Sequence, residues 1–238
     1  MAALGIIGSG NIGSVVAWLA ADAGLDVVMA NSRGPESLAD KVRDLGVRAA
    51  TVDEAVRAGD WVLVTIPLGR YAELPVEPFA GKVVLDTMNY YPHRDGRIDR
   101  LDREVMTTAQ LLQEHLPEAH TVKAFNNISA RNIITLARPA DAADRSAVPI
   151  AGDDADAKAA ATTLIQTLGF DVVDVGPLSE SWRFEPETAA YVTPYLSKGS
   201  TAKQRAAGHA DPGKPLPVAN LVQLIAAAHR PPVAGREF

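Results

Sequence analysis

The 238-residue sequence predicts an α/β fold, with a doubly wound, mainly parallel sheet, helices on both faces and a small Pro-rich C-terminal cap or arm. Three observations predict this class. Short runs rich in Val, Ile and Leu alternate with stretches of helical periodicity. The runs contain few polar positions, which is typical of strands covered on both faces. The first run also leads directly into a glycine-rich turn and a helix.

The alternation extends over most of the chain. The expected strands are Leu4–Gly8, Asp26–Asn31, Trp61–Ile66, Lys82–Asp86, Thr121–Phe125, Ala147–Ala151 and Phe170–Val175. The expected helices are Asn11–Asp22, Pro35–Leu45, Val52–Ala58, Asp102–His115, Asp154–Leu168 and Val218–His229. Residues 179–238 contain seven prolines and show no strand pattern. We therefore expect a sheet domain over residues 1–178 and a cap or arm over residues 179–238.

Composition excludes several classes of function. The formal net charge is −6 and the chain has no block of Lys and Arg, so we expect neither nucleic acid nor a membrane as partner. The apolar runs are too short to span a bilayer. The chain has no cysteine, which excludes disulfides and Cys-ligated zinc, and no histidine spacing indicates a metal. The start does not resemble a signal peptide, so a cytoplasmic location is expected.

The glycine-rich turn has the spacing of a dinucleotide-binding site. A strand before it and a helix after it are the context in which such a motif binds a pyrophosphate. The first glycine permits a tight turn, the second lets the backbone approach the phosphates, and the third lets helix and strand pack closely. The exposed N–H groups at the helix start then receive the anion. The motif consists of Gly8, Ser9, Gly10, Asn11, Ile12 and Gly13.

The end of the second expected strand indicates which dinucleotide binds. An NAD site usually places Asp or Glu here, and that carboxylate would repel a 2′-phosphate. This chain instead has a neutral amide at Asn31, a hydroxyl at Ser32 and a guanidinium at Arg33. A guanidinium suits phosphate geometrically as well as electrostatically. The sequence therefore favours NADP(H). Thr65, Ile66 and Pro67 lie at the end of the expected strand that begins at Trp61, where the nucleotide in such folds extends toward its nicotinamide.

Taken together, the sequence resembles the family of F420-dependent NADP reductases, which shares its dinucleotide domain with the STEAP-type metalloreductases. The resemblance covers roughly residues 4–187. It rests on GSGNIG (8–13), NSRGP (31–35), VTIP (64–67), VKAFNNISA (122–130), VPIAGDDADAK (148–158) and DVGPLSES (174–181).

The resemblance implies hydride transfer between NADP(H) and a deazaflavin (F420) or flavin, held face to face in a cleft. The deazaflavin contacts that it implies fall on Asn126, Asn127 and Ile128, and on the turn Pro177–Ser179. Asn89 is a further expected cofactor contact. Such a reaction needs apposition of two cofactors and little acid–base help, so no catalytic residue is assigned.

Two other functions stay open. The loop that runs from residue 89 to 96 follows a strand, and Tyr90, Tyr91 or His93 could donate a proton to a small organic substrate of an NADPH-dependent reductase. A plain solvent-exposed turn explains the same loop. Alternatively, the chain is a non-catalytic NADP(H) sensor whose tail docks a partner. The apolar helix near the C-terminus is compatible with a homodimer, and we expect Lys123 to reach solvent from its strand.

Overall fold

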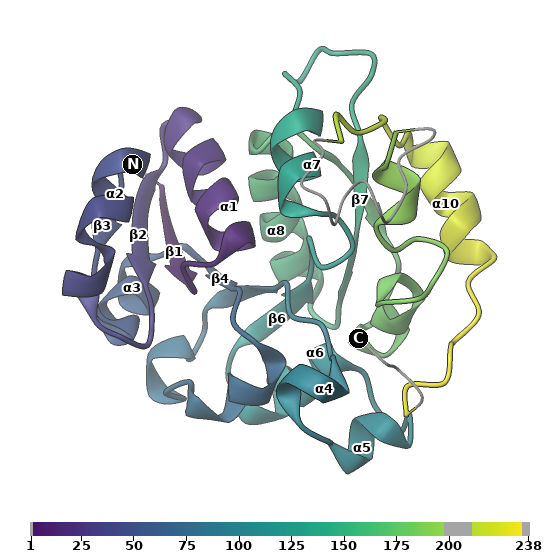
Figure 1. Cartoon of the computed structure of the whole chain (residues 1–238), viewed down its shortest axis with the longest axis horizontal. Coiled ribbons are helices and arrows are strands. Elements are labelled where there is room, and N and C mark those ends of the chain that lie inside the picture. The colour runs from purple at the N-terminus through teal and green to yellow at the C-terminus, as the bar shows by residue number, and fades with distance from the viewer. Residues whose placement is uncertain (1, 198–210, 235–238) are drawn as a thin grey trace.

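The computed structural model describes residues 2–197 and 211–234. Its centre is one eight-stranded sheet in the order β3-β2-β1-β4-β5-β6-β7-β8 (Figure 1). All neighbouring strands are parallel except β6 and β7. The strands are β1 (Ala3–Ile7), β2 (Asp26–Ala30), β3 (Arg48–Ala49), β4 (Trp61–Val64), β5 (Val83–Asp86), β6 (His120–Lys123), β7 (Ala147–Gly152) and β8 (Asp171–Asp174). The predicted fold class is confirmed.

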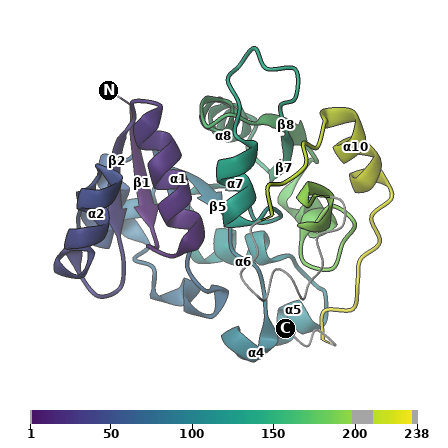
Figure 2. The same cartoon turned by 45° about the horizontal axis from the view of Figure 1, so that its top comes forward.

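Helices cover both faces of this sheet. The α-helices are α1 (Asn11–Asp22), α2 (Ala39–Leu45), α3 (Val52–Ala58), α4 (Pro92–Asp95), α5 (Asp99–Asp102), α6 (Thr108–His115), α7 (Ala130–Leu136), α8 (Ala155–Thr167) and α10 (Val218–Ala226). Short 3₁₀ turns complete the chain: η1 (Pro35–Leu38), η2 (Leu68–Glu73), η3 (Glu77–Phe79), η4 (Leu178–Phe184) and η5 (Thr193–Tyr195). Figure 2 shows α1 beside α7 on one face, and the two helices are in contact.

The two-residue period of each strand divides the core between the faces. In β4, Leu63 belongs to a cluster with α1, α7, α8 and α10, whereas Val62 and Val64 belong to a second cluster with α3 and α6. Leu85 and Val84 of β5 divide in the same way. Burial on both faces explains why the strands read as unbroken apolar runs.

The helix expected over Asp102–His115 is wrong. The chain forms the short α5, then a turn in which Glu104 has φ 57°, then α6. Thr107 accepts a hydrogen bond from the Gln110 amide, and the Gln110 side chain accepts one from the Thr107 amide. This capping box starts a new helix where the sequence indicated a continuous one.

The C-terminal part packs against the sheet domain. Phe184, Tyr195, Leu221 and Ile225 are buried in the same cluster as α8, and α10 contacts β7 and β8. Because the core is shared, the division at residue 178 stays a prediction. No helix in the described ranges is long and apolar enough to cross a membrane.

Candidate functional site

Two cavities lie at the carboxyl ends of the central strands. The first has a volume of about 540 Å³ and the second about 420 Å³. Gly10, Thr65, Ile66 and Pro67 line both, so the cavities adjoin along one wall. β1 has β2 on one side and β4 on the other, and open α/β sheets bind ligands at this switch point of strand order.

The three glycines of the turn differ in what surrounds them. Gly8 has φ 122°, and a Cβ there would lie 2.2 Å from the Thr65 carbonyl oxygen. A Cβ on Gly13 would lie 2.1 Å from the Gly8 oxygen, because α1 packs closely onto the turn. A Cβ on Gly10 would meet no heavy atom within 4 Å. Gly8 and Gly13 are therefore required by packing, whereas the space beside Gly10 is open toward the cavities.

The start of α1 has free backbone donors for an anion and no acidic residue that would repel it. Gly10 is its N-cap and supplies no side-chain hydrogen bond, and its first turn contains no acidic residue. By contrast, Thr51 caps α3, Thr107 caps α6 and Asp154 caps α8. The uncapped N–H groups of α1 and its positive dipole end remain available to a phosphate.

The segment after β2 forms a polar wall of the first cavity. Asn31 accepts a hydrogen bond from the Arg33 amide at 2.8 Å and donates one to the Ser37 hydroxyl at 2.9 Å. Ser32 and Arg33 line the cavity beside Asn31. Among the described residues, no carboxylate forms an ion pair with the Arg33 guanidinium, which leaves its charge available to a ligand.

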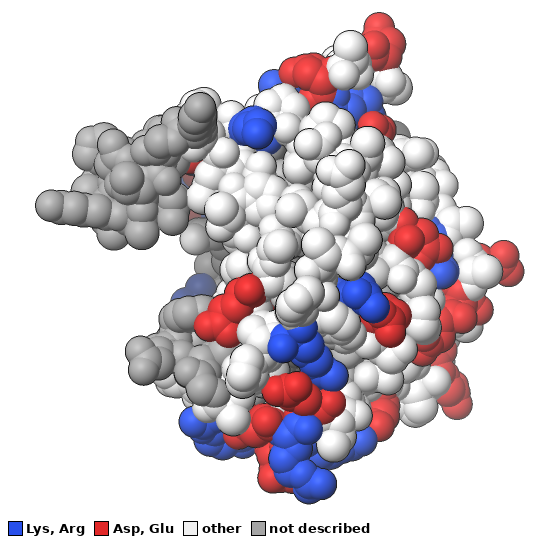
Figure 3. All heavy atoms as spheres, turned by 90° about the vertical axis from the view of Figure 1, so that its right-hand side faces the viewer, with Lys and Arg blue, Asp and Glu red and all other residues white. Residues whose placement is uncertain are grey.

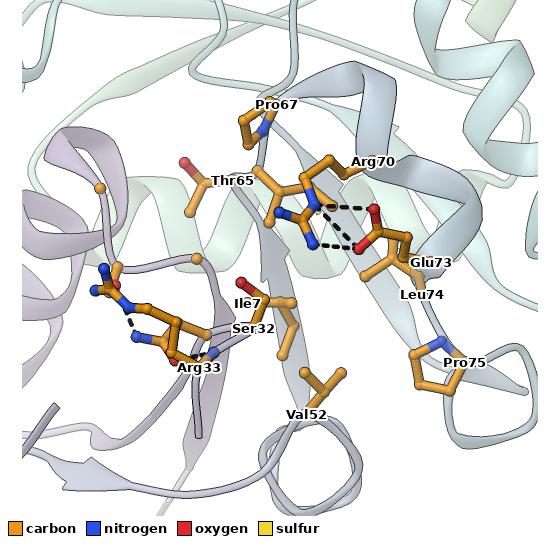
Figure 4. Close-up of a pocket in the computed structure, with 15 residues that line it drawn as sticks. Ile7, Ser32, Arg33, Val52, Thr65, Pro67, Arg70, Glu73, Leu74 and Pro75 are labelled. Carbon is orange, nitrogen blue, oxygen red and sulfur yellow. Dashed lines mark hydrogen bonds and ion pairs between the residues drawn. The ribbon is translucent and has the colours of Figure 1, made fainter. Parts of the chain in front are cut away.

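The opposite wall was not foreseen from the sequence. Arg70 of η2 donates from Nε to both carboxylate oxygens of Glu73 at 3.0 Å. Figure 4 shows this pair on the far side of the cavity from Arg33. Leu74 and Pro75 add apolar surface. No local motif marks these residues, because they reach the cavity only through the turn that follows β4.

The second cavity is assembled from segments far apart in the sequence. Arg94 is the one charged side chain among the described residues that line it. Apolar side chains share the lining with amide and hydroxyl groups in similar measure. The lining consists of Gly10, Asn11, Ile12, Thr65, Ile66, Pro67, Thr87, Met88, Asn89, Tyr91, Arg94, Phe125, Asn126, Ile128, Ser129, Ala130, Tyr191 and Val192.

A pair of asparagines connects two walls of this cavity. Asn89 donates from Nδ2 to the Asn126 carbonyl oxygen at 2.8 Å, and Asn126 donates back to Asn89 Oδ1 at 3.1 Å. Asn126 also donates to the Phe184 carbonyl oxygen at 3.0 Å. The loop after β5, the turn after β6 and η4 are thereby held together.

The loop after β5 is a short helix, α4, and not an open turn. Tyr90 is buried and donates to Asp102, and burial raises the pKa of its hydroxyl. His93 is exposed and lies outside the cavity lining. Of the three side chains considered as proton donors, only Tyr91 lines the cavity. Its hydroxyl contacts that of Tyr191, and the Arg94 guanidinium lies 4.7 Å from its ring centroid.

The expectation that Lys123 reaches solvent is wrong. Its side chain is fully buried, and its ammonium donates to the Asp86 carboxylate at 3.0 Å, the Met88 carbonyl oxygen and the Thr108 hydroxyl at 2.9 Å. Thr108 in turn donates to Glu185 at 2.7 Å. Burial raises the pKa of Asp86, and the adjacent Lys123 ammonium acts in the opposite sense. The cluster fixes Met88, which lines the second cavity.

Other predicted contacts lie elsewhere. Asn127 is buried and donates to the Ala190 carbonyl oxygen and the Tyr195 hydroxyl. Burial raises the pKa of that tyrosine. The turn Pro177–Ser179 is not among the lining residues. The described parts of the chain contain no group of three or more His, Asp or Glu that could hold a metal.

The sheet order, the glycine turn at the switch point and the groove beside it define a Rossmann-type dinucleotide-binding fold. Residues 3–90 match the family described as "NADP oxidoreductase coenzyme F420-dependent". The predicted resemblance is confirmed by this match, which covers the N-terminal part of the chain.

Similar proteins extend the likeness beyond residue 90. Metalloreductase STEAP3 of Rattus norvegicus is 29% identical over 184 residues, which are 76% of this chain and 35% of the relative. The chain thus spans about a third of that protein. A hypothetical protein of Sinorhizobium meliloti has a solved structure that is 29% identical, with a TM-score of 0.66 over 80% of this chain and 93% of that one.

A third relative supports the fold. The structure of a putative F420-dependent NADP reductase from Arthrobacter sp. FB24 is 24% identical and has a TM-score of 0.62. The match covers 76% of this chain and 87% of that chain. The fold therefore includes most of the part that follows residue 90.

Proposed function

We propose that this chain binds NADP(H) in the first cavity and transfers a hydride between its nicotinamide and a deazaflavin or flavin in the second. One observation carries the proposal: the two cavities adjoin at Gly10 and at Thr65–Pro67. A dinucleotide whose pyrophosphate sits on the start of α1 would place its two ends in the two cavities.

The residues present fit this cofactor. The open space at Gly10 admits a pyrophosphate, and the α1 N–H groups are uncapped. Arg33, Ser32 and Asn31 offer donors without a carboxylate at the end of β2. Ile7, Val52 and Leu74 supply an apolar surface that suits an adenine ring.

The second cavity suits a planar ring system. When bound, NADPH supplies the hydride, and the acceptor supplies the ring that receives it. The chain's own part is to hold the two rings face to face and to exclude water. Ile12, Ile66 and Ile128 provide apolar contact, while Asn89 and Asn126 hold the walls at a fixed separation. Orientation of two bound reactants is the main contribution that this geometry offers to the rate.

The test is anaerobic stopped-flow mixing of the full chain and NADPH with F420, FMN or FAD in turn. We expect NADPH oxidation with one of these acceptors, and slower oxidation of NADH under the same conditions. Oxidation of NADPH with none of the three would contradict the proposal.

A second candidate is an NADPH-dependent reductase of a small carbonyl or imine compound. It is favoured by one observation: Tyr91, a possible proton donor, lines the same cavity. Activity with a panel of small aldehydes, ketones and imines that is lost in Tyr91→Phe would support it.

The homodimer stays a prediction, as does a cytoplasmic location. The face that carries α10, a helix without charged residues, shows a broad uncharged area (Figure 3).

A further inference from the structure

A lysine from outside the motif lies against the glycine turn. Lys41 of α2 donates from Nζ to the Ser9 carbonyl oxygen at 2.6 Å and to the Ser14 hydroxyl at 3.2 Å. The nearby carboxylates of α2, Asp40 and Asp44, pair instead with Arg43. No carboxylate of the described chain forms an ion pair with Lys41, so its charge is directed at the turn and is not neutralised.

The turn connects Lys41 to the polar wall of the first cavity. The Asn31 amide lies 3.5 Å from the Ser9 hydroxyl and 2.9 Å from the Ser37 hydroxyl. Ser9 and Asn31 both line the cavity. The ammonium of Lys41 therefore contacts Ser9, a residue that lines the cavity together with Ser32 and Arg33.

The charge of a 2′-phosphate, compared with that of the nearby side chains, indicates a role for Lys41. A phosphate monoester carries a charge of about −1.5 to −2 at neutral pH. Arg33 supplies one positive charge, and one oxygen of the Glu36 carboxylate lies 3.1 Å from where a Cβ of Gly34 would be. One guanidinium alone does not balance the charge of a phosphate dianion. Lys41 supplies the second positive charge that a 2′-phosphate dianion needs.

We propose that Lys41 is a specificity-determining residue whose ammonium binds the ribose 2′-phosphate of NADP(H) together with Arg33. Its flexible four-carbon side chain lets the ammonium turn from the Ser9 carbonyl oxygen toward a phosphate at the same wall. This inference rests on the proposed binding of NADP(H) and adds a residue that the motif at Asn31–Arg33 does not contain.

The experiment compares Lys41→Gln with Arg43→Gln in the full chain. Both variants remove one exposed positive charge from α2, but Arg43 forms ion pairs with Asp40 and Asp44 and not with the turn. Dissociation constants are measured for NADPH, NADH, adenosine 2′,5′-bisphosphate and adenosine 5′-monophosphate. Thermal unfolding without ligand checks that each variant folds.

We expect Lys41→Gln to weaken NADPH and the bisphosphate about tenfold and NADH and the monophosphate less than about twofold. Arg43→Gln should change none of the four by more than about twofold, and Lys41→Arg should retain most of the NADPH affinity. Equal weakening of NADPH and NADH would overturn the inference, because Lys41 would then serve the turn or the pyrophosphate. Unchanged NADPH affinity would overturn it as well. A wild-type chain that does not prefer NADPH to NADH would refute NADP(H) specificity itself, which is a different result.

Discussion

The two cavities differ in how much of the chain builds them. The first takes its whole lining from residues 7–75, and this lining includes guanidinium groups, hydroxyls and the start of α1. The second combines five short stretches between residues 10 and 192, and its lining mixes apolar side chains with amides, hydroxyls and one cation. The lining of the first cavity thus contains more charged side chains than that of the second. The difference teaches that the first cavity depends on local motifs, whereas the second depends on how the whole chain packs.

The largest expected effect concerns the buried cluster beneath the second cavity. Lys123→Met removes a cation and leaves the Asp86 carboxylate and its neighbour Glu185 buried without it. We expect a loss of about 3–5 kcal/mol in the free energy of unfolding, measured by urea denaturation. Lys158→Met is the control, because its ion pair with Asp174 lies near the surface, and it should cost about 0–1 kcal/mol. Similar losses in the two variants would show that the buried Lys123 cluster contributes no more to the free energy of unfolding than a surface ion pair.

Two glycine substitutions separate packing from ligand binding in the first half. Gly13→Ala should destabilise the chain by about 1–3 kcal/mol, because its Cβ meets the Gly8 oxygen at 2.1 Å. Gly10→Ala should leave the unfolding midpoint nearly unchanged and yet weaken NADPH and NADH alike, since only the ligand occupies the space of its Cβ. Thermal unfolding and nucleotide titration measure both. Unaltered nucleotide binding in Gly10→Ala would argue against a pyrophosphate at this turn.

A guanidinium substitution tests the preference for NADP(H). Arg33→Ala should weaken NADPH binding by about 1–3 kcal/mol, the value of a charge-assisted contact, with little effect on NADH. Isothermal titration with each nucleotide measures the difference. If both nucleotides lose equally, Arg33 contributes to the site as a whole and not to the 2′-phosphate.

The smallest expected effect lies at the exposed edge of the sheet. A hydrogen bond from Arg48 holds the pKa of Asp26 below its ordinary value of 3.8. Because the folded-state pKa is lowered, the stabilisation is present above about pH 4 and is lost as pH falls through the folded-state pKa. Arg48→Gln should therefore lower the unfolding midpoint slightly at pH 6, and the difference should disappear at the acid end. A difference that grows toward low pH would contradict this assignment.

The sequence predicts the sheet and the first cavity better than it predicts the second cavity. The strands and the switch point were predictable because burial on two faces produces apolar runs. The cofactor wall was predictable because Gly8 to Gly13 and Asn31 to Arg33 form local patterns. Of the predicted cofactor contacts, those that line neither cavity are Gly13, Asn127 and the turn Pro177–Ser179.

The rest depends on contacts that no local pattern encodes. Lys123 looks like an ordinary strand residue, and its burial follows only from Asp86 on the neighbouring strand and Glu185 directly after η4. Tyr191 reaches the second cavity from 100 residues beyond Tyr91. Arg70 reaches the first cavity from η2, and Lys41 of α2 contacts Ser9, which lines that cavity. Such side chains become visible only when the packing of the elements is known.

The reversal of strand direction between β6 and β7 has a consequence for the architecture. β7 pairs with the end of β6 only through Gly152 and Ala151. Its earlier residues therefore continue past the point where β6 stops. At that level Phe170, just before β8, packs edge-on against Phe125 of the second cavity, with ring centroids 5.7 Å apart. The last two strands thus extend the sheet beyond the carboxyl end of β6, and Phe170 supports from behind a side chain that lines the second cavity.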